Sequence, residues 1–241
     1  MDRLIALVRG DFDRLNKYNL FTANFVVLLF WVGISWFFEG AELKMFVPII
    51  FLVDSTVMTM LLVGATLFYE KQEHAISSIM VSPVTEDEYL LSKIIVSVLN
   101  SLITVIFISA ALYFIKGVTY NYLLVVPAVM VVTVAHTIIG IRLSYDAKSF
   151  SSMLVNLVIY NFVFLFPAVL AALGLIGENV AKFLILLPPE AANILISTVV
   201  RHVAPWRLVF GYGYLTVLSL VLYRFLIKPQ FNDYVMRETG V

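Results

Sequence analysis

The stretch MFVPIIFLVDSTVMTMLLVGATLFY, residues 45–69, decides the fold class of this chain. Its only formal charge is at Asp54. A helix needs about 20 mainly apolar residues to cross the hydrocarbon core of a bilayer. The stretch is therefore expected to form a membrane-spanning helix, and a chain built from such stretches is an all-α membrane protein.

The same criterion, applied outward in both directions, gives about six candidate spans. The chain has 61% hydrophobic and 13% charged residues and a mean hydropathy of +0.97, whereas a soluble domain has about 25% charged residues. We expect a single polytopic membrane domain over residues 1–241. The candidate spans are 21–38, 45–69, 94–115, 122–141, 152–176 and 208–227.

Charge and residue usage exclude several classes of function. The 16 basic and 16 acidic side chains cancel, which provides no field to attract nucleic acid. The chain has no cysteine and three scattered histidines, so neither a disulfide, a cysteine nucleophile nor a metal centre is expected. A membrane-embedded enzyme is the weakest hypothesis, because no His-Glu-x-x-His motif occurs.

The distribution of basic residues predicts the orientation. With an even number of spans both termini lie on one side, and this side carries eleven basic residues against five. The positive-inside rule then places both termini in the cytoplasm of a cell, which we expect to be prokaryotic. The eleven are Arg3, Arg9, Arg14, Lys17, Lys71, Lys93, Arg142, Lys148, Arg224, Lys228 and Arg237, and the five are Lys44, Lys116, Lys182, Arg201 and Arg207.

Two segments outside the spans have patterns of their own. Residues 1–20 carry apolar side chains on one helical face, which predicts an interfacial helix, with a solvated tail as the alternative. In 177–207, two apolar runs too short to cross are separated by Pro188-Pro189, which predicts an outer re-entrant hairpin. An ordinary amphipathic surface loop is the alternative for that segment.

The stretch between the second and third spans, EKQEHAISSIMVSPVTEDEYLLSK at 70–93, is more structured than a connection requires. Its apolar residues predict a short amphipathic helix that Pro83 stops at Ser82. Thr85 and Glu88 have the spacing of a capping box, which starts the next helix. Lys93 is expected to anchor that helix near the lipid headgroups. The segment is thus predicted to present a compact surface to a cytoplasmic partner.

This stretch resembles the cytoplasmic loop of type-2 ABC exporter permeases. The matching features are Glu70, the apolar run 76–81, Ser82-Pro83, Glu88 and the lysine that enters the third span. The six spans, the N-terminal helix and the hairpin also fit that family, so the resemblance covers essentially the whole chain. The chain departs from the family pattern at His74, where glycine is usual, and at the acidic residues that follow Thr85.

The resemblance implies a transport subunit without an ATPase site of its own. The loop would dock on a separate ABC ATPase, present in two copies with ATP and magnesium, and a second identical or related permease would complete the path. No Gly-Lys dipeptide occurs in the chain, so it has no phosphate-binding P-loop, and no cofactor is expected. The expected coupling residues are Glu70, Glu73, Ile76, Ile79, Met80, Ser82, Pro83 and Glu88.

Polar residues inside the spans are candidates for a translocation path. An ionised Asp54 would cost about 2.5–3.5 kcal/mol in the bilayer, so it either serves the path, binds a cation or proton, or makes a contact between helices. The other candidates are Asn100, His136, Asn156 and Asn161, for which helix packing is the alternative role.

Together these observations predict the permease of an ATP-driven exporter for a small amphiphilic compound, drug, lipid or peptide. An ion-coupled secondary transporter that uses Asp54 is the alternative, although the two halves of the chain show no convincing repeat.

Overall fold

The computed structural model describes residues 2–236, and these residues form helices joined by short links, without any strand. Arg237, one of the basic residues counted for the orientation, lies outside the described residues. Three π-helical segments, η1 to η3, interrupt the α-helices. The elements are α1 Asp2–Lys17, α2 Leu20–Ser35, α3 Gly40–Val53, η1 Asp54–Met58, α4 Thr59–Gln72, α5 Ala75–Met80, α6 Glu86–Lys116, α7 Tyr122–Tyr145, α8 Phe150–Tyr160, η2 Asn161–Leu165, α9 Phe166–Ala172, α10 Glu178–Leu184, α11 Pro188–Ser197, α12 Pro205–Leu222, η3 Tyr223–Ile227 and α13 Lys228–Met236.

Five helices in the described part of the chain are long and apolar enough to cross a membrane. They are Gly40–Gln72, Glu86–Lys116, Tyr122–Tyr145, Phe150–Ala171 and Pro205–Met236. α2 becomes the sixth if it is counted with α1, from which it is bent by 69°. Alone, the 16 residues of α2 reach only about 24 Å. The all-α polytopic fold is as predicted, and the first span ends at Ser35 instead of Phe38.

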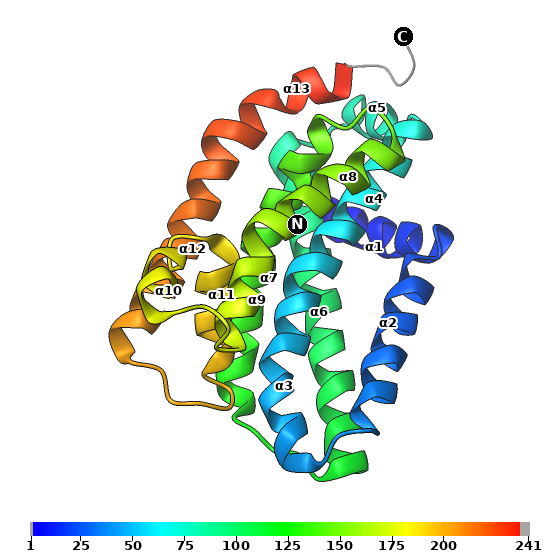
Figure 1. The fold of residues 1–241 in the computed structure, drawn as a ribbon. Helices are drawn as coiled ribbons and strands as arrows, with labels where there is room; N and C mark the ends of the chain where they lie inside the picture. The colour runs from blue at the N-terminus through cyan, green and yellow to red at the C-terminus, as the bar shows by residue number, and fades with distance from the viewer. Residues whose placement is uncertain (1, 237–241) are drawn as a thin grey trace.

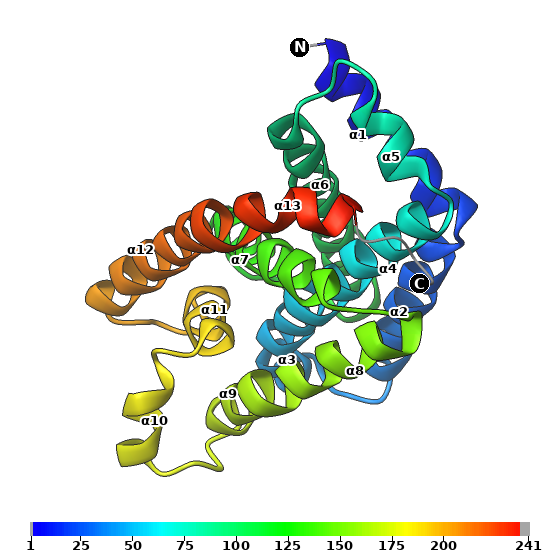
Figure 2. The same cartoon turned by 90° about the horizontal axis from the view of Figure 1, so that it is seen from above.

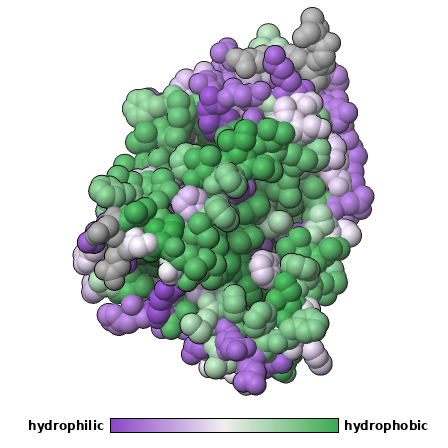
Figure 3. Space-filling model, in the orientation of Figure 1, coloured by the Kyte–Doolittle hydropathy of each residue, from purple (hydrophilic) through white to green (hydrophobic). Residues whose placement is uncertain are grey.

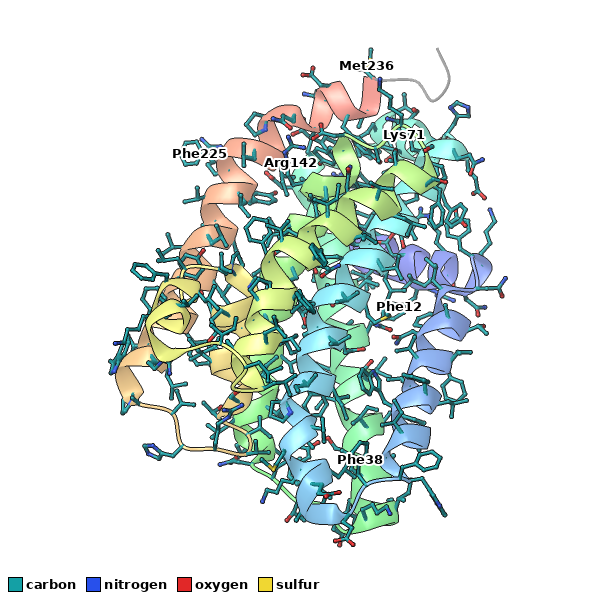
Figure 4. All side chains as sticks on the ribbon, in the orientation of Figure 1. Phe12, Phe38, Lys71, Arg142, Phe225 and Met236 are labelled. Atoms are coloured by element: carbon teal, nitrogen blue, oxygen red, sulfur yellow. The ribbon has the colours of Figure 1, made fainter. Side chains whose placement is uncertain are left out.

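The long helices run side by side between two polar ends (Figure 1). Lys71, Arg142 and Met236 mark the end that carries α5 and α13, here called the loop end, and Phe38 marks the far end (Figure 4). On the face that Figure 3 shows, the middle is mostly apolar, and hydrophilic residues gather at the two ends and along the upper right edge. This is the surface expected of a multi-pass membrane protein.

Two of the π-helical segments stand immediately before a proline. η2 is followed by Phe166-Pro167, and η3 by Lys228-Pro229. A proline inside a helix lacks the backbone donor and its ring crowds the carbonyl four residues earlier. A wider π turn relieves this crowding, so each helix continues through its proline. This explains why the last span extends to Met236, beyond the predicted end at Ile227.

The centre of the bundle is α7, which packs on α4, α6, α11 and α12. At Gly140, an added Cβ would lie 3.0 Å from the Met60 Cα, so α7 and α4 are in close backbone contact. Close approach at small residues is the usual way in which membrane helices gain packing energy.

α11 is inserted into the bundle, between α7, α12, α3 and α9. Its residues Pro189 to Ser197 are all buried, and Leu195 contacts Gly211 of α12. Its 10 residues are too few to span a bilayer. The burial of α11 does not fit an exposed surface loop, and a re-entrant hairpin stays the prediction for this segment. Figure 2 shows α11 enclosed by its neighbours and α10 at the periphery.

Candidate functional site: the loop end and its ion network

The loop between α4 and α6 forms two sharp corners around α5. His74 adopts a left-handed backbone conformation, with φ of 56°, and separates α4 from α5. α5 ends at Met80, two residues before the predicted stop. At the second corner the Thr85 Oγ1 accepts a hydrogen bond from the Glu88 backbone at 3.2 Å, and the Thr85 backbone donates to the Glu88 carboxylate at 2.9 Å. The predicted capping box is therefore present.

α5 has a packed face and an open face. Ile76 is buried, and Ile79 and Met80 pack on the cluster around it, which includes residues of α4, α6 and α13. Ser77 and Ser78 are exposed, and the Val81 side chain is 88% exposed. The apolar face is thus used to hold α5 against the bundle. Any protein that docks on α5 must contact the opposite face.

A buried network of four charged side chains lies directly beneath the loop. The Lys93 ammonium of α6 contacts the Asp11 carboxylate of α1 at 2.5 Å and also binds the Glu70 carboxylate at the end of α4. Arg14 contacts Asp11 at 2.6 Å and Glu70 at 3.2 Å. The Tyr89 hydroxyl donates to Glu70 at 2.5 Å. Two carboxylates and two cations make the network neutral, and it joins α1, α4 and α6.

α1 is attached to the loop at both of its ends. The Lys17 ammonium lies 2.7 Å from the Glu73 carboxylate, to which the Tyr18 hydroxyl also donates at 2.9 Å. These two hydrogen bonds lower the pKa of Glu73 below its usual value. At the other end the Arg3 guanidinium donates to the Pro83 carbonyl at 2.5 Å. α1 therefore runs alongside α5, as Figure 2 shows.

The network changes the interpretation of three predicted residues. Lys93 was expected to reach the headgroups, but its side chain is 2% exposed because two carboxylates hold it inside the bundle. Glu70 and Ile76 are also buried, so neither can touch a docking partner directly. Of the other expected coupling residues, Glu73, Ser82 and Pro83 are exposed, while Ile79, Met80 and Glu88 are half-buried.

Sequence reasoning missed Asp11, Arg14 and Tyr89 as members of the site. Asp11 and Arg14 were recognisable as an i, i+3 pair of opposite charge, and Tyr89 stands one turn before Lys93. Their convergence on Glu70 depends on the contact between α1, α4 and α6, which no local pattern records. The described residues contain no group of histidine and carboxylate side chains that could hold a metal ion.

The structure does not bring the predicted path residues to one cavity. Asn156 of α8 donates to the Leu143 carbonyl of α7 at 3.2 Å, and Asn161 donates to the carbonyl of Leu157 at 2.8 Å. The Asn156 contact joins two helices, whereas the Asn161 contact lies within its own helix and leaves its Oδ1 without a partner among residues 2–236. Asn100 accepts a hydrogen bond from Asn24 of α2 at 3.5 Å.

Asn100 also lines a small cavity between α1, α4 and α6, of about 20 Å³. Asp11 and Lys93 lie on its wall, so this cavity adjoins the ion network. Its volume is sufficient for about one water molecule.

Asp54 and His136 have unusual surroundings. Asp54 begins η1 and is 3% exposed, and its Oδ1 has no hydrogen-bond partner among residues 2–236. The His136 Nδ1–H donates to the Val132 carbonyl oxygen, 2.8 Å away, and Nε2 of the same ring has no hydrogen-bond partner among residues 2–236. Buried polar atoms without partners are costly in a membrane and often mark functional positions. These two residues remain the best path candidates.

His74 offers a direct test of the loop geometry. The left-handed conformation costs an ordinary residue about 1–2 kcal/mol, a cost that glycine avoids. We expect His74→Gly to keep or slightly raise the thermal stability of the purified protein. His74→Val should lower stability by about 1–2 kcal/mol, because β-branched residues are disfavoured at positive φ. Equal melting temperatures for the two variants would contradict this geometry.

The chain was compared with known proteins to place this arrangement. It is 28% identical over 196 residues to the fluoroquinolones export permease proteins of two Mycobacterium tuberculosis strains, CDC 1551 / Oshkosh and ATCC 25618 / H37Rv. Each alignment covers 80% of this chain and 80% of the relative. Over most of its length the chain is therefore similar to proteins named as export permeases. This similarity agrees with the resemblance of the loop sequence.

The other two comparisons found no match. No family model matches the sequence, and no solved structure matches the fold. The similarity to export permeases is therefore shown by the curated relatives alone, and the helical membrane fold described above agrees with it.

Proposed function

We propose that this exporter permease is the membrane subunit of an ATP-driven transporter, and that α5 is the point at which a separate ABC ATPase docks. The observation that carries the proposal is the way α5 is mounted. Its open face, with Ser77, Ser78 and Val81, is exposed. α1 and the Glu70–Lys93 network connect the surroundings of α5 to two spans. A push on α5 would therefore move α4 and α6 together.

The ATP-hydrolysing step is assigned to the partner. Because the chain lacks a Gly-Lys dipeptide, the phosphates of ATP and their magnesium would be held by the ATPase subunit. Two permeases, identical or related, would pair with two ATPases, and the termini would face the cytoplasm. The relatives are named for the export of fluoroquinolones. For this exporter permease we propose a small amphiphilic cargo of that general kind.

Copurification tests the proposal. The tagged exporter permease is extracted from its native membrane in mild detergent, and proteins that copurify in stoichiometric amounts are identified, with ATPase activity assayed on the same sample. A P-loop ATPase present at one copy per permease supports the proposal. A folded permease without ATPase protein or activity contradicts it.

Asp54 supports a second candidate, an ion-coupled transporter, because its buried carboxylate has an oxygen without a partner among the described residues. Uptake of the cargo into inverted vesicles distinguishes the ATP-driven exporter from the ion-coupled transporter. Transport that needs ATP and survives an uncoupler of the proton gradient supports the exporter with an ATPase. Transport that an imposed proton or sodium gradient drives without ATP, and that Asp54→Asn abolishes, supports the ion-coupled alternative.

A further inference from the structure

A second feature of the loop end is a groove on the lipid-facing side of the bundle. α6 and α12 both pack on α7, and the space between them is a groove of about 510 Å³. Ligand sites commonly have volumes of about 300–1,000 Å³. The groove has α7 as its floor and lies on the side of the bundle opposite α8 and α9 (Figure 2). Its lining residues are Asp87, Leu91, Ile94, Met130, Val131, Val134, Ile138, Thr216, Ser219, Leu220 and Tyr223.

The walls of the groove suit a hydrocarbon chain. The floor residues Val131, Val134 and Ile138 follow one another along α7 at helical spacing. Ser219, on the α12 wall, gives its hydroxyl hydrogen to the Leu215 carbonyl of its own helix, at 2.7 Å. An occupant therefore meets an almost wholly apolar surface, and a long polar molecule would lose its hydration there without compensation.

The loop end of the groove is polar and charged. Lys228 lies 2.6 Å from the Asp87 carboxylate, and the Tyr223 hydroxyl donates to the same carboxylate at 2.5 Å. The neighbouring Glu86 lines a groove between α5 and α13 together with Asp87 and Lys228, so this end holds two carboxylates beside two cations. Arg224 is exposed, stands one turn before Lys228 and is not part of the Lys228–Asp87 ion pair. Its guanidinium is therefore accessible to an anionic group.

We propose that this groove binds one phospholipid with an anionic headgroup. Its acyl chain lies along α7 between α6 and α12, and its phosphate contacts Arg224 and Lys228. The exposed Arg224 guanidinium, which lies outside the Lys228–Asp87 ion pair, selects for the headgroup. Tyrosine and lysine are typical of the level at which headgroups lie in a membrane, which agrees with this placement. The site is separate from α5 and from the path candidates Asp54 and His136.

Native mass spectrometry of the purified exporter permease tests the site. The delipidated protein is titrated with phosphatidylglycerol or phosphatidylcholine in mixed micelles, and the bound lipids are counted. We expect one retained phosphatidylglycerol per chain and about tenfold weaker binding of phosphatidylcholine. Val134→Phe fills the floor of the groove and should abolish retention. Val158→Phe, on the exposed face of α8, is the matched control and should not.

Further variants keep the test decisive. If Val134→Phe impairs folding, Leu220→Trp narrows the groove from an exposed position of α12 and should give the same loss. Arg224→Gln should remove the preference for the anionic lipid, whereas Lys148→Gln, at an exposed position in the α7–α8 turn, should preserve it. Retention by both groove-filling variants, or equal affinity for the two lipids in the unmodified protein, overturns the proposal. Counting the bound lipids requires no ATPase, so the result of this experiment is independent of the proposed docking on α5.

Discussion

Replacing Lys93 by methionine is expected to destabilise the protein by about 3–5 kcal/mol, because it leaves two buried carboxylates with Arg14 as the only cation of the network. Lys93 and Glu70 are both at most 2% exposed, so bulk solvent does not reach the carboxylates to replace the lost contacts. The measurement is unfolding of the purified protein in mixed micelles, followed by circular dichroism. Export by the variant should fall with its stability.

A double variant distinguishes this explanation from loss of packing. Glu70→Gln combined with Lys93→Met restores neutrality, since Asp11 and Arg14 remain paired. The double variant should therefore be less destabilised than the sum of the two single variants. Lys17→Met, which removes the exposed partner of Glu73, serves as the control and should have a much smaller effect. Additive single effects would contradict a network in which the charges compensate one another.

The sequence was most informative where a single local rule governs the structure. The spans could be located because a bilayer admits only long apolar helices. The corner before α6 could be located because Thr85 and Glu88 are three residues apart and satisfy each other's backbone groups. Both kinds of signal lie within a short window of the chain.

The ion network could not be predicted, because its members are distant in sequence. Lys93 and Asp11 are 82 residues apart, and a lysine at the start of a span normally reaches for the headgroups. The sequence also does not predict which face of α5 is exposed. Ile76 and Ile79 could have faced a partner as well as the bundle, and the choice depends on the tertiary packing of α4, α6, α7 and α13 around Ile76.

The positions of the π-helical segments are also difficult to predict from the sequence. A proline such as Pro167 is known to perturb a helix, but the irregular turn lies upstream of it, in η2, which begins at Asn161. Asp54 begins η1 without a proline beside it, and the structure provides no reason for the widened turn there. A carboxylate at an irregular turn within a span fits a position at which the helix must change during transport.

Val81→Asp is expected to abolish docking of the ATPase while leaving the permease folded. Val81 is the most exposed apolar side chain beside α5, and nothing in the bundle requires it. A carboxylate buried without a partner in an interface costs several kcal/mol, and each 1.4 kcal/mol is about tenfold in affinity. Copurified ATPase should therefore fall by at least about tenfold, with thermal stability unchanged.

The choice of Val81 follows from the two faces of α5. Ile79→Asp would also reduce copurification, but it should lower the thermal stability as well, since Ile79 packs on the bundle. Lys148→Asp, at an exposed position of the same end, is the control and should leave both quantities unchanged. If Val81→Asp retains the full amount of ATPase, then α5 is an internal connector and the ATPase must dock elsewhere on the loop end.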